Sequence, residues 1–317
     1  AETWLMLHPV YGLRTSGISA DYGARFAYDG VEEFLQNYTR GPEVYLDAIR
    51  EWAHTIYRDA MERHDKRFFL DKTPRYFFII PELYELFPKA RFVFLLRNPM
   101  AVLSSELSTY VQENWPILGI FKHDLISAPG WMLDGIELLG DRGYVIHYEQ
   151  FVKNPEKSIQ ALCLYLDLDY KDSMLDYSGT PQPVGRFNDP TGINQHTRPS
   201  TGSVDKWKGM VNDDQELYFA RSYLDHLGEE TITRLGYDYR EIYQELHARS
   251  LSTKGLYPWS IAIQPDSEWT CRQAFVSDLF LNRRDKGWLK GTLSTFKKHL
   301  KKVLKGLWYE LSSPEAL

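Results

Sequence analysis

The chain has 317 residues, 43% of them hydrophobic and 15% aromatic, which is enough for a sizeable hydrophobic core. Its 37 basic and 43 acidic residues leave a net charge of −6, so bulk attraction to nucleic acid is excluded and any anion site must be local. Cys163 and Cys271 are far apart and lack metal-ligand spacing, so we interpret them as ordinary thiols rather than a disulfide. No apolar run reaches the length of about 18 residues that a membrane span requires.

Helical and strand-like segments alternate along the first half of the chain. The expected helices cover residues 4–14, 43–64, 76–86 and 154–166, and the expected strands cover residues 67–70, 92–96 and 144–148. Strands that alternate with helices predict an α/β fold with a central parallel sheet. Ligands of such sheets bind at the carboxyl ends of the strands, where Asp71-Lys72, Arg97 and Tyr148-Glu149 are expected.

The second half of the chain is less regular. Residues 178–210 are rich in Gly, Pro, Ser, Thr and Asn and are predicted to form a functional loop. The pattern weakens after about residue 250, so we expect a main domain over 1–250 and an extension over 251–317. The extension contains a basic amphipathic helix, in which Lys297, Lys298, Lys301, Lys302 and Lys305 interleave with Leu293, Phe296, Leu300, Leu304 and Leu307. Such a helix contacts a membrane or an acidic partner, or, more commonly, packs its apolar stripe on its own domain.

Arg97 stands at the tip of the strand expected over residues 92–96, and Pro99 opens the helix that follows. Ser105 lies about two turns into that helix. A forked guanidinium, a hydroxyl and the N–H groups of a helix amino terminus together suit a phosphate. By themselves these residues also fit an arginine that caps a strand and a serine on a helix face, so the pattern leaves both interpretations open.

The sequence around Arg97 resembles a known family. Residues 87–105, Phe-Pro-Lys-Ala-Arg-Phe-Val-Phe-Leu-Leu-Arg-Asn-Pro-Met-Ala-Val-Leu-Ser-Ser, closely resemble the 3′-phosphate-binding stretch of sulfotransferases that use 3′-phosphoadenosine 5′-phosphosulfate (PAPS). The spacing of eight between Arg97 and Ser105 matches the family pattern. The resemblance implies that both residues bind the 3′-phosphate of the nucleotide.

Two segments resemble the sulfuryl-transfer end of this family. Residues 70–76, Leu-Asp-Lys-Thr-Pro-Arg-Tyr, are similar to the Lys-[Ser/Thr]-Pro segment of the carbohydrate and protein-tyrosine branches, which implies that Lys72 contacts the transferring sulfonate. Thr3 and Trp4 look like the end of the loop that binds the 5′-phosphosulfate. The strand and the first part of that loop would precede residue 1, and Glu2 stands where a threonine is usual.

Two other segments resemble the part of the family that holds the nucleotide. Residues 146–151, followed by Asn154-Pro155, look like the element beside the adenine, which implies that Tyr148 contacts the base. Residues 202–208, Gly-Ser-Val-Asp-Lys-Trp-Lys, resemble the late loop that folds over the cofactor. The nucleotide-binding residues implied for this loop are Arg198, Ser200, Thr201 and Gly202.

A base must take the proton of the acceptor. The histidine used by the cytosolic small-molecule branch is absent, because Pro74 and Arg75 occupy its neighbourhood. In the branches with Lys-Thr-Pro, the resemblance points to a carboxylate shortly after the first helix, and Asp21 is the nearest match. Asp21 also fits a solvated loop aspartate, and His196 in the late loop is the next candidate to contact an acceptor.

The resemblance implies a P-loop-type three-layer α/β fold with a central parallel sheet flanked by helices, and its first strand would lie before residue 1. The implied activity is transfer of a sulfuryl group from PAPS, without a metal ion, to a hydroxyl or amine of an unidentified acceptor such as a glycan, a lipid or a secondary metabolite. The alternatives are a P-loop nucleotide kinase and a non-catalytic nucleotide-binding module on the same fold. The cysteine usage and the lack of a visible anchor favour a cytoplasmic enzyme.

Overall fold

The protein is described by a computed structural model, which covers residues 3–11, 14, 24–178, 197–252, 254–264, 279, 288–297 and 300. The contacts within the chain divide it into two units, the first made of residues 1–105 and 123–256 and the second of residues 106–122 and 257–317. The domain boundary expected near residue 250 stays a prediction.

The first unit begins with a series of helices. They are α1 (Leu7–Tyr11), α2 (Ala24–Tyr38), α3 (Glu43–Arg63), the 3₁₀ helix η1 (Pro74–Ile79) and α4 (Ile80–Leu86). Pro74 and Pro81 stand in the first turns of η1 and α4, where the missing N–H of proline has no helical partner to lose. A hydrophobic core joins α1 and the residue before it to α3, η1 and α4, through Met6, Val10, Ile49, Ala53, Ile79, Leu83 and Leu86.

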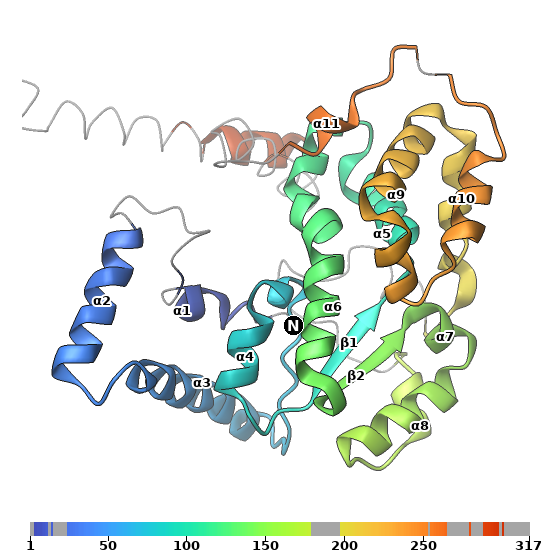
Figure 1. Cartoon of the computed structure of the whole chain (residues 1–317). Coiled ribbons are helices and arrows are strands. Elements are labelled where there is room, and N and C mark those ends of the chain that lie inside the picture. Colours follow the sequence, from blue (N-terminus) through green and yellow to red (C-terminus); the bar gives the residue numbers. More distant parts are fainter. Residues whose placement is uncertain are drawn as a thin grey trace, which may run out of the picture. The chain divides into compact units, whose positions relative to one another are not determined.

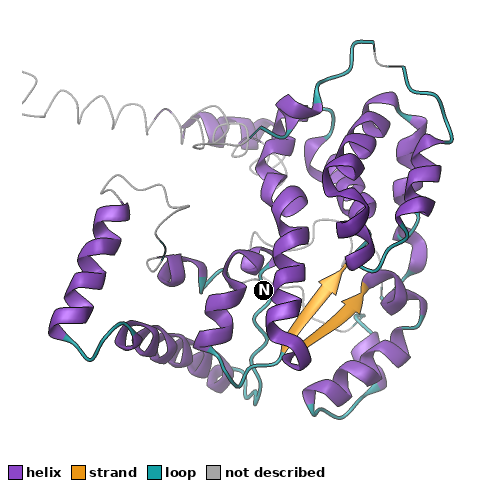
Figure 2. Cartoon of the chain, in the orientation of Figure 1, coloured by secondary structure: helices purple, strands orange, loops and turns teal. Residues whose placement is uncertain are grey.

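The described residues contain one sheet, formed by β1 (Phe92–Leu96) and β2 (Gly143–His147). The strands are parallel (Figure 2). Their register runs from Phe92 opposite Gly143 to Leu96 opposite His147. Helix α6 (Ala128–Leu139) lies between them in the sequence and packs beside the sheet (Figure 1). The predicted α/β class with a parallel sheet is therefore confirmed, whereas the full three-layer architecture and the strand before residue 1 stay predictions.

The two faces of β1 differ in burial. Phe94 packs in one cluster with Ala128 and Leu139 of α6, and Leu96 packs in another with Leu133 and Leu235. The alternate residues of this strand, Val93 and Leu95, are 40% and 58% exposed. Because successive side chains of a strand point to opposite faces, one apolar run supplies both a buried and an exposed surface.

The prediction of a strand over residues 67–70 is wrong. This segment has no strand pairing, and Phe68 and Leu70 are 59% and 84% exposed. Phe69 instead stacks on Tyr57 of α3, with ring centroids 4.3 Å apart. A strand requires a neighbour to which its backbone can hydrogen-bond, and in the described part of the chain β1 and β2 pair only with each other.

The remaining elements of the first unit are helices and short helical turns. The helices are α5 (Pro99–Glu106), which ends at the first residue of the second unit, α7 (Tyr148–Lys153), α8 (Pro155–Leu166), α9 (Asp214–Arg234) and α10 (Tyr239–His247), with shorter turns η4 (His123–Ser127), η5 (Gly140–Arg142), η6 (Asp172–Leu175), η7 (Thr201–Ser203) and η8 (Lys206–Asn212). The helices predicted over residues 43–64 and 154–166 correspond to α3 and α8.

The second unit is helical in its described part. It contains η2 (Leu107–Val111), η3 (Trp115–Phe121) and α11 (Trp259–Ala262), and α11 packs against η3. Residues 288–297 are also helical. Among the helices that the structure describes, none has both the length and the hydropathy that crossing a membrane demands.

Candidate active site

The ends of the two strands bring Arg97 and Tyr148 together. Leu96 and His147 are opposite each other in the register, so the next residue of each strand emerges at the same edge of the sheet. The guanidinium carbon of Arg97 lies 4.7 Å from the centroid of the Tyr148 ring, which is a cation–π contact. Parallel pairing therefore joins two predicted site residues that are about fifty positions apart in the sequence.

The late loop meets this pair through Ser203. Arg97 donates from Nη2 to the carbonyl oxygen of Ser203 at 3.2 Å, and the hydroxyls of Tyr148 and Ser203 share a hydrogen bond of 2.7 Å. Ser203 ends the turn η7, which Ser200 caps by accepting from the N–H of Gly202. Ser203 was not predicted as a site residue, and the only sequence signal for it was its place directly after Gly202.

Arg97 keeps one buried N–H group without an acceptor. Its Nε atom is buried and has no hydrogen-bond partner among the residues that the structure describes. A buried donor on a cation is costly to leave unsatisfied, and it favours an anionic oxygen as its partner. This atom and the Ser203 hydroxyl are donors that suit the oxygens of a phosphate group.

The carboxylate of Glu149 holds the strand tips in place through hydrogen bonds. Glu149 accepts from the backbone N–H of Asn98 and from the hydroxyl of Tyr237, each at 2.9 Å. Asn98 in turn accepts from the N–H of Met100 at the start of α5, at 2.9 Å. Burial, followed by the Glu149 charge, raises the pKa of Tyr237, so this phenol stays a donor at neutral pH.

His147, the last residue of β2, is held by the segment after α9. Its Nε2 atom hydrogen-bonds with the carbonyl of Leu235 at 2.9 Å. Gly236 follows with φ +89°, and a Cβ atom there would lie 2.6 Å from Nε2 of His147. Glycine is thus required both by the backbone conformation and by the close approach of the imidazole.

Asp71 ties the start of the chain to the predicted transfer segment. Its carboxylate accepts from the hydroxyl of Thr3 at 2.6 Å, from that of Tyr76 at 2.8 Å and from that of Tyr57. The backbone N–H of Trp4 also donates to the Thr73 hydroxyl at 3.0 Å. These bonds fix the predicted 5′-phosphosulfate residues against the segment that carries Lys72.

The partners of Asp71 keep their protons at neutral pH. Burial, followed by the hydrogen bond to Asp71, raises the pKa of Tyr57 well above its usual value. Burial also raises the pKa of Tyr76. Both phenols therefore act as donors, and Asp71 is their acceptor. The sequence placed Asp71 with Lys72 at the expected end of a strand, but it gave Asp71 no role of its own in the site.

Lys72 itself is exposed, and the residues before and after it, Asp71 and Thr73, are held by hydrogen bonds. Thr73 is buried, with 7% exposure, and Arg75 makes a two-pronged ion pair with Asp124 of η4, at 2.7 and 3.2 Å. Two hydrogen bonds in a fixed fork give such a pair directional strength. The ammonium thus projects from a short segment whose backbone is held on both sides.

The structure describes some of the other predicted site residues and not others. Ser105 is half-buried near the end of α5, and Ser200 is half-buried at the start of η7. Arg198, Thr201 and Gly202 are exposed in the described end of the late loop. The predicted base Asp21 and the alternative His196 lie outside the described residues.

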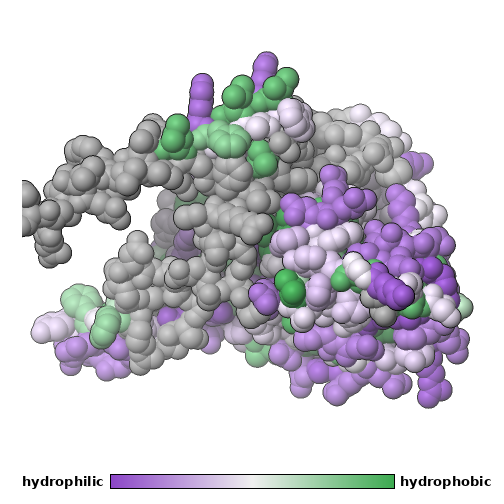
Figure 3. Space-filling model, turned by 90° about the horizontal axis from the view of Figure 1, so that it is seen from above, coloured by the Kyte–Doolittle hydropathy of each residue, from purple (hydrophilic) through white to green (hydrophobic). Residues whose placement is uncertain are grey.

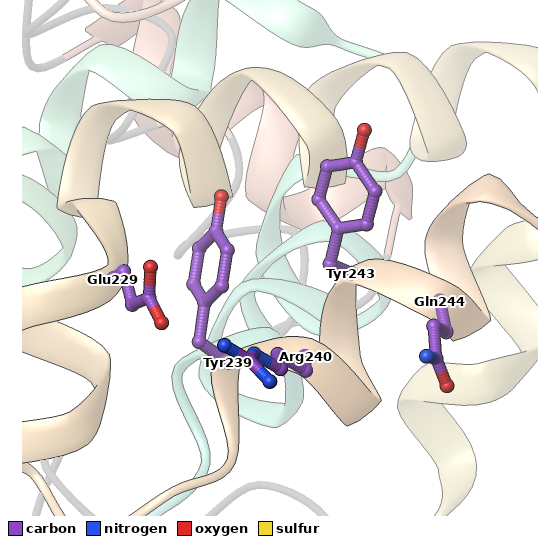
Figure 4. Close-up of a pocket in the computed structure, with 5 residues that line it drawn as sticks. All are labelled: Glu229, Tyr239, Arg240, Tyr243 and Gln244. Atoms are coloured by element: carbon purple, nitrogen blue, oxygen red, sulfur yellow. The ribbon is translucent and has the colours of Figure 1, made fainter.

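A cavity lies apart from these residues. It has a volume of about 240 Å³ and is lined by Glu229 of α9 and by Tyr239, Arg240, Tyr243 and Gln244 of α10 (Figure 4). None of the predicted site residues lines it. The candidate active site is therefore defined by its hydrogen bonds and strand ends rather than by this cavity.

The sulfotransferase family model matches residues 2–172, which is more than half of the chain, so the chain belongs to the sulfotransferase family. This confirms the resemblance carried by residues 87–105. The chain is 26% identical over 264 residues to the nodulation protein NoeE of Sinorhizobium fredii, covering 75% of this chain and 59% of NoeE. It is also 26% identical over 165 residues to protein-tyrosine sulfotransferase A of Caenorhabditis elegans, covering 49% of this chain and 41% of that protein.

Among solved structures, the chain is similar to the sulfotransferase domain from the curacin biosynthetic pathway. The TM-score is 0.41 at 18% sequence identity, with 64% of this chain and 79% of that one covered. The chain spans less than two thirds of the length of NoeE and of protein-tyrosine sulfotransferase A.

Proposed function

We propose that the protein transfers a sulfuryl group from PAPS to a hydroxyl or amine of an acceptor. The observation that carries this proposal is Arg97 at the carboxyl edge of the sheet, whose buried Nε atom has no hydrogen-bond partner among the described residues, in a chain of the sulfotransferase family. PAPS supplies the sulfuryl group, and the protein supplies binding, orientation and positive charge. Because the chain belongs to the sulfotransferase family, a nucleotide kinase is a weaker interpretation than a sulfotransferase.

The nucleotide end of the proposed site is built on the strand tips and the late loop. Arg97 and Ser105 bind the 3′-phosphate, and Tyr148 lies beside the adenine. The late loop contributes Arg198, Ser200, Thr201 and Gly202. The contacts of Ser203 with Arg97 and Tyr148 support this assignment, because they bring the loop onto the two strand-tip residues.

The transfer end of the proposed site is built on Lys72, Thr3 and Trp4. Lys72 stabilises the negative charge that develops while the sulfuryl group is transferred, which is the contribution that fixed charges make most effectively in an enzyme. Thr3 and Trp4 form the end of the loop around the 5′-phosphosulfate. Asp71 supports the assignment, because it binds Thr3 next to the segment of Lys72.

Two carboxylates are candidates for the base. Asp21 is proposed from the family resemblance. Asp71 is proposed from its position, since it directly precedes Lys72 in the sequence. From the described residues its carboxylate receives three hydroxyl donors, and it has about four lone-pair sites, so these residues leave one site for the hydroxyl of an acceptor.

The acceptor is proposed to be a hydroxyl compound such as a glycan, a lipid or a secondary metabolite. The relative from C. elegans is named for protein tyrosine, which also offers a hydroxyl. A cytoplasmic location and catalysis without a metal ion remain predictions. Contact of the C-terminal helix with a membrane surface is also proposed.

A binding comparison that needs no acceptor tests the proposed function. We expect 3′,5′-diphosphoadenosine to bind at least about tenfold more tightly than ADP in calorimetric titrations without magnesium, because ADP lacks the 3′-phosphate. Arg97→Ala should weaken only the 3′-phosphorylated ligand and so remove the difference. Arg142→Ala is the matched control, since Arg142 lies at the opposite end of β2. Equal affinities, or a magnesium-dependent preference for ATP, would contradict the proposal.

A further inference from the structure

The cavity lined by α9 and α10 lies beside a bend in α9. Within this helix Gly228 has φ 73° and ψ 167°, far from helical values. This combination of angles is accessible to glycine almost alone, so the bend is built into the sequence at this position. Glu229, the next residue, lines the cavity. The cavity is therefore formed at a place where the backbone departs from regular structure, as binding sites often do.

Helix α10 supplies two neighbouring rows of side chains to the cavity. Tyr239 and Tyr243 are one helical turn apart and form the first row, and Arg240 and Gln244 form the second. Figure 4 shows both tyrosine rings projecting from the helix that also carries Arg240 and Gln244. The lining thus combines aromatic rings from one row with hydrogen-bonding groups from the other.

The spacing of the aromatic row limits how a ligand can lie. The ring centroids of Tyr239 and Tyr243 are 6.0 Å apart, and His247 stacks on Tyr243 at 3.9 Å. A ring inserted between two others needs about 7 Å, because each of its two contacts takes about 3.5 Å. The gap between the tyrosines is narrower than this, so a ligand lies across the row rather than within it. Tyr243 is 43% exposed and accessible for such a contact.

The polar groups of the cavity suit an uncharged ligand. Arg240 and Glu229 carry opposite formal charges, which cancel, so an ion of either sign would meet one like charge. No hydrogen bond or ion pair to another described residue occupies the side chains of Arg240, Gln244 or Glu229. A guanidinium only donates, a carboxylate only accepts and an amide does both. Groups that donate and accept at once, such as hydroxyls, match this set.

We propose that the cavity binds one uncharged sugar ring of a carbohydrate. A pyranose ring has C–H groups on its faces, which pack on the tyrosine row, and hydroxyls around its edge, which bond to Arg240, Gln244 and Glu229. The volume of about 240 Å³ lies below the range of about 300–1,000 Å³ for drug-sized ligands, so a single ring fits. Figure 3 shows mainly hydrophilic residues at the surface on the side where α9 and α10 lie, whereas a larger apolar patch usually marks a protein partner.

The proposal goes beyond the transfer reaction. The residues proposed for PAPS binding and transfer do not line this cavity. Sugar binding here therefore holds whether or not sulfuryl transfer is confirmed, and the two are tested with different ligands.

Saturation-transfer-difference NMR on the full chain tests the proposal. The probe is methyl β-D-glucopyranoside, an uncharged ring with all its substituents equatorial. D-Glucitol is the matched control ligand, because it is an open-chain polyol without a ring face. We expect transfer to the ring C–H protons of the glucoside, with a millimolar dissociation constant for so few atoms, and little transfer to D-glucitol. Equal transfer to both compounds would overturn the proposal.

Tyrosine variants locate the binding. Tyr243→Ala should weaken glucoside binding about fivefold, the loss expected for one aromatic contact, and leave the affinity for 3′,5′-diphosphoadenosine unchanged. Tyr243→Phe keeps the ring and should retain most of the binding. Tyr38→Ala is the matched control, since Tyr38 is 79% exposed on α2 and stacks on Phe34 with centroids 5.6 Å apart. The same loss from Tyr38→Ala as from Tyr243→Ala would contradict the proposal.

Charged probes test the alternative that the cavity binds an ion. Choline and phenyl phosphate each combine a charge with an apolar surface that a tyrosine can contact. If either binds at least about tenfold more tightly than the glucoside, and Tyr243→Ala weakens that binding, the cavity is a site for a charged ligand and the sugar proposal is wrong.

Discussion

Removal of the Asp71 carboxylate should destabilise the fold and release the start of the chain. Asp71→Ala leaves the hydroxyls of Thr3, Tyr57 and Tyr76 without their acceptor. All of these contacts are partly buried, so water replaces the lost bonds only in part. A loss of about 1 kcal/mol for each bond gives about 3 kcal/mol of unfolding free energy in total.

Urea denaturation measures this loss, and hydrogen exchange locates it. Backbone amides near Thr3 should exchange faster in Asp71→Ala, because Trp4 and Met6 donate to the neighbouring Thr73 and Tyr76 hydroxyls. Tyr76→Phe should cost about 1 kcal/mol alone and much less when added to Asp71→Ala, because the two residues share one interaction.

An isosteric variant of Asp71 separates its structural role in the hydrogen-bond network from a catalytic role. Asp71→Asn retains an acceptor oxygen and the shape of the side chain, so it should cost less stability than Asp71→Ala. If Asp71 is also the base, Asp71→Asn should lower the transfer rate far more than it lowers stability. An Asp71→Ala protein whose unfolding free energy lies within about 0.5 kcal/mol of the wild type would refute the network, since that is the range of neutral surface substitutions.

Lys72→Ala should lower the transfer rate about 100- to 1000-fold and leave the affinity for 3′,5′-diphosphoadenosine nearly intact, because the charge that Lys72 stabilises develops during transfer; a near-normal rate would remove it from the mechanism. If Asp21 is the base, Asp21→Asn should depress transfer without changing the affinity for PAPS, and an active variant with an unaltered pH–rate profile would move the role to Asp71 or His196. Gly236→Ala should cost about 2 kcal/mol or more of stability and loosen nucleotide binding, because its Cβ collides with His147. The control Gly255→Ala has a similar positive φ but open space around its Cβ, so an equal effect on nucleotide affinity would contradict the steric explanation.

Local patterns were enough to predict several elements of this protein. The apolar run of β1 and the helical spacing of α3 and α8 identified these elements, because strand and helix periodicities depend only on neighbouring residues. The same local information fails for residues 67–70, since a short apolar run does not show whether a neighbouring strand is present. The segment around Arg97 also identified the family, because its motif is continuous in the sequence.

The tertiary structure alone decided how the site is assembled. Asp71 collects hydroxyls from residues 5, 14 and 68 positions away, and Arg97 reaches a carbonyl 106 positions away. No periodicity encodes such contacts, because they arise from the packing of α3 and the first residues against η1 and from the register of β1 with β2. The helix over residues 288–297 is a second case, in which Gly291 and Thr295 are buried. Its amphipathic spacing was visible in the sequence, but only packing decides which side of a helix is buried.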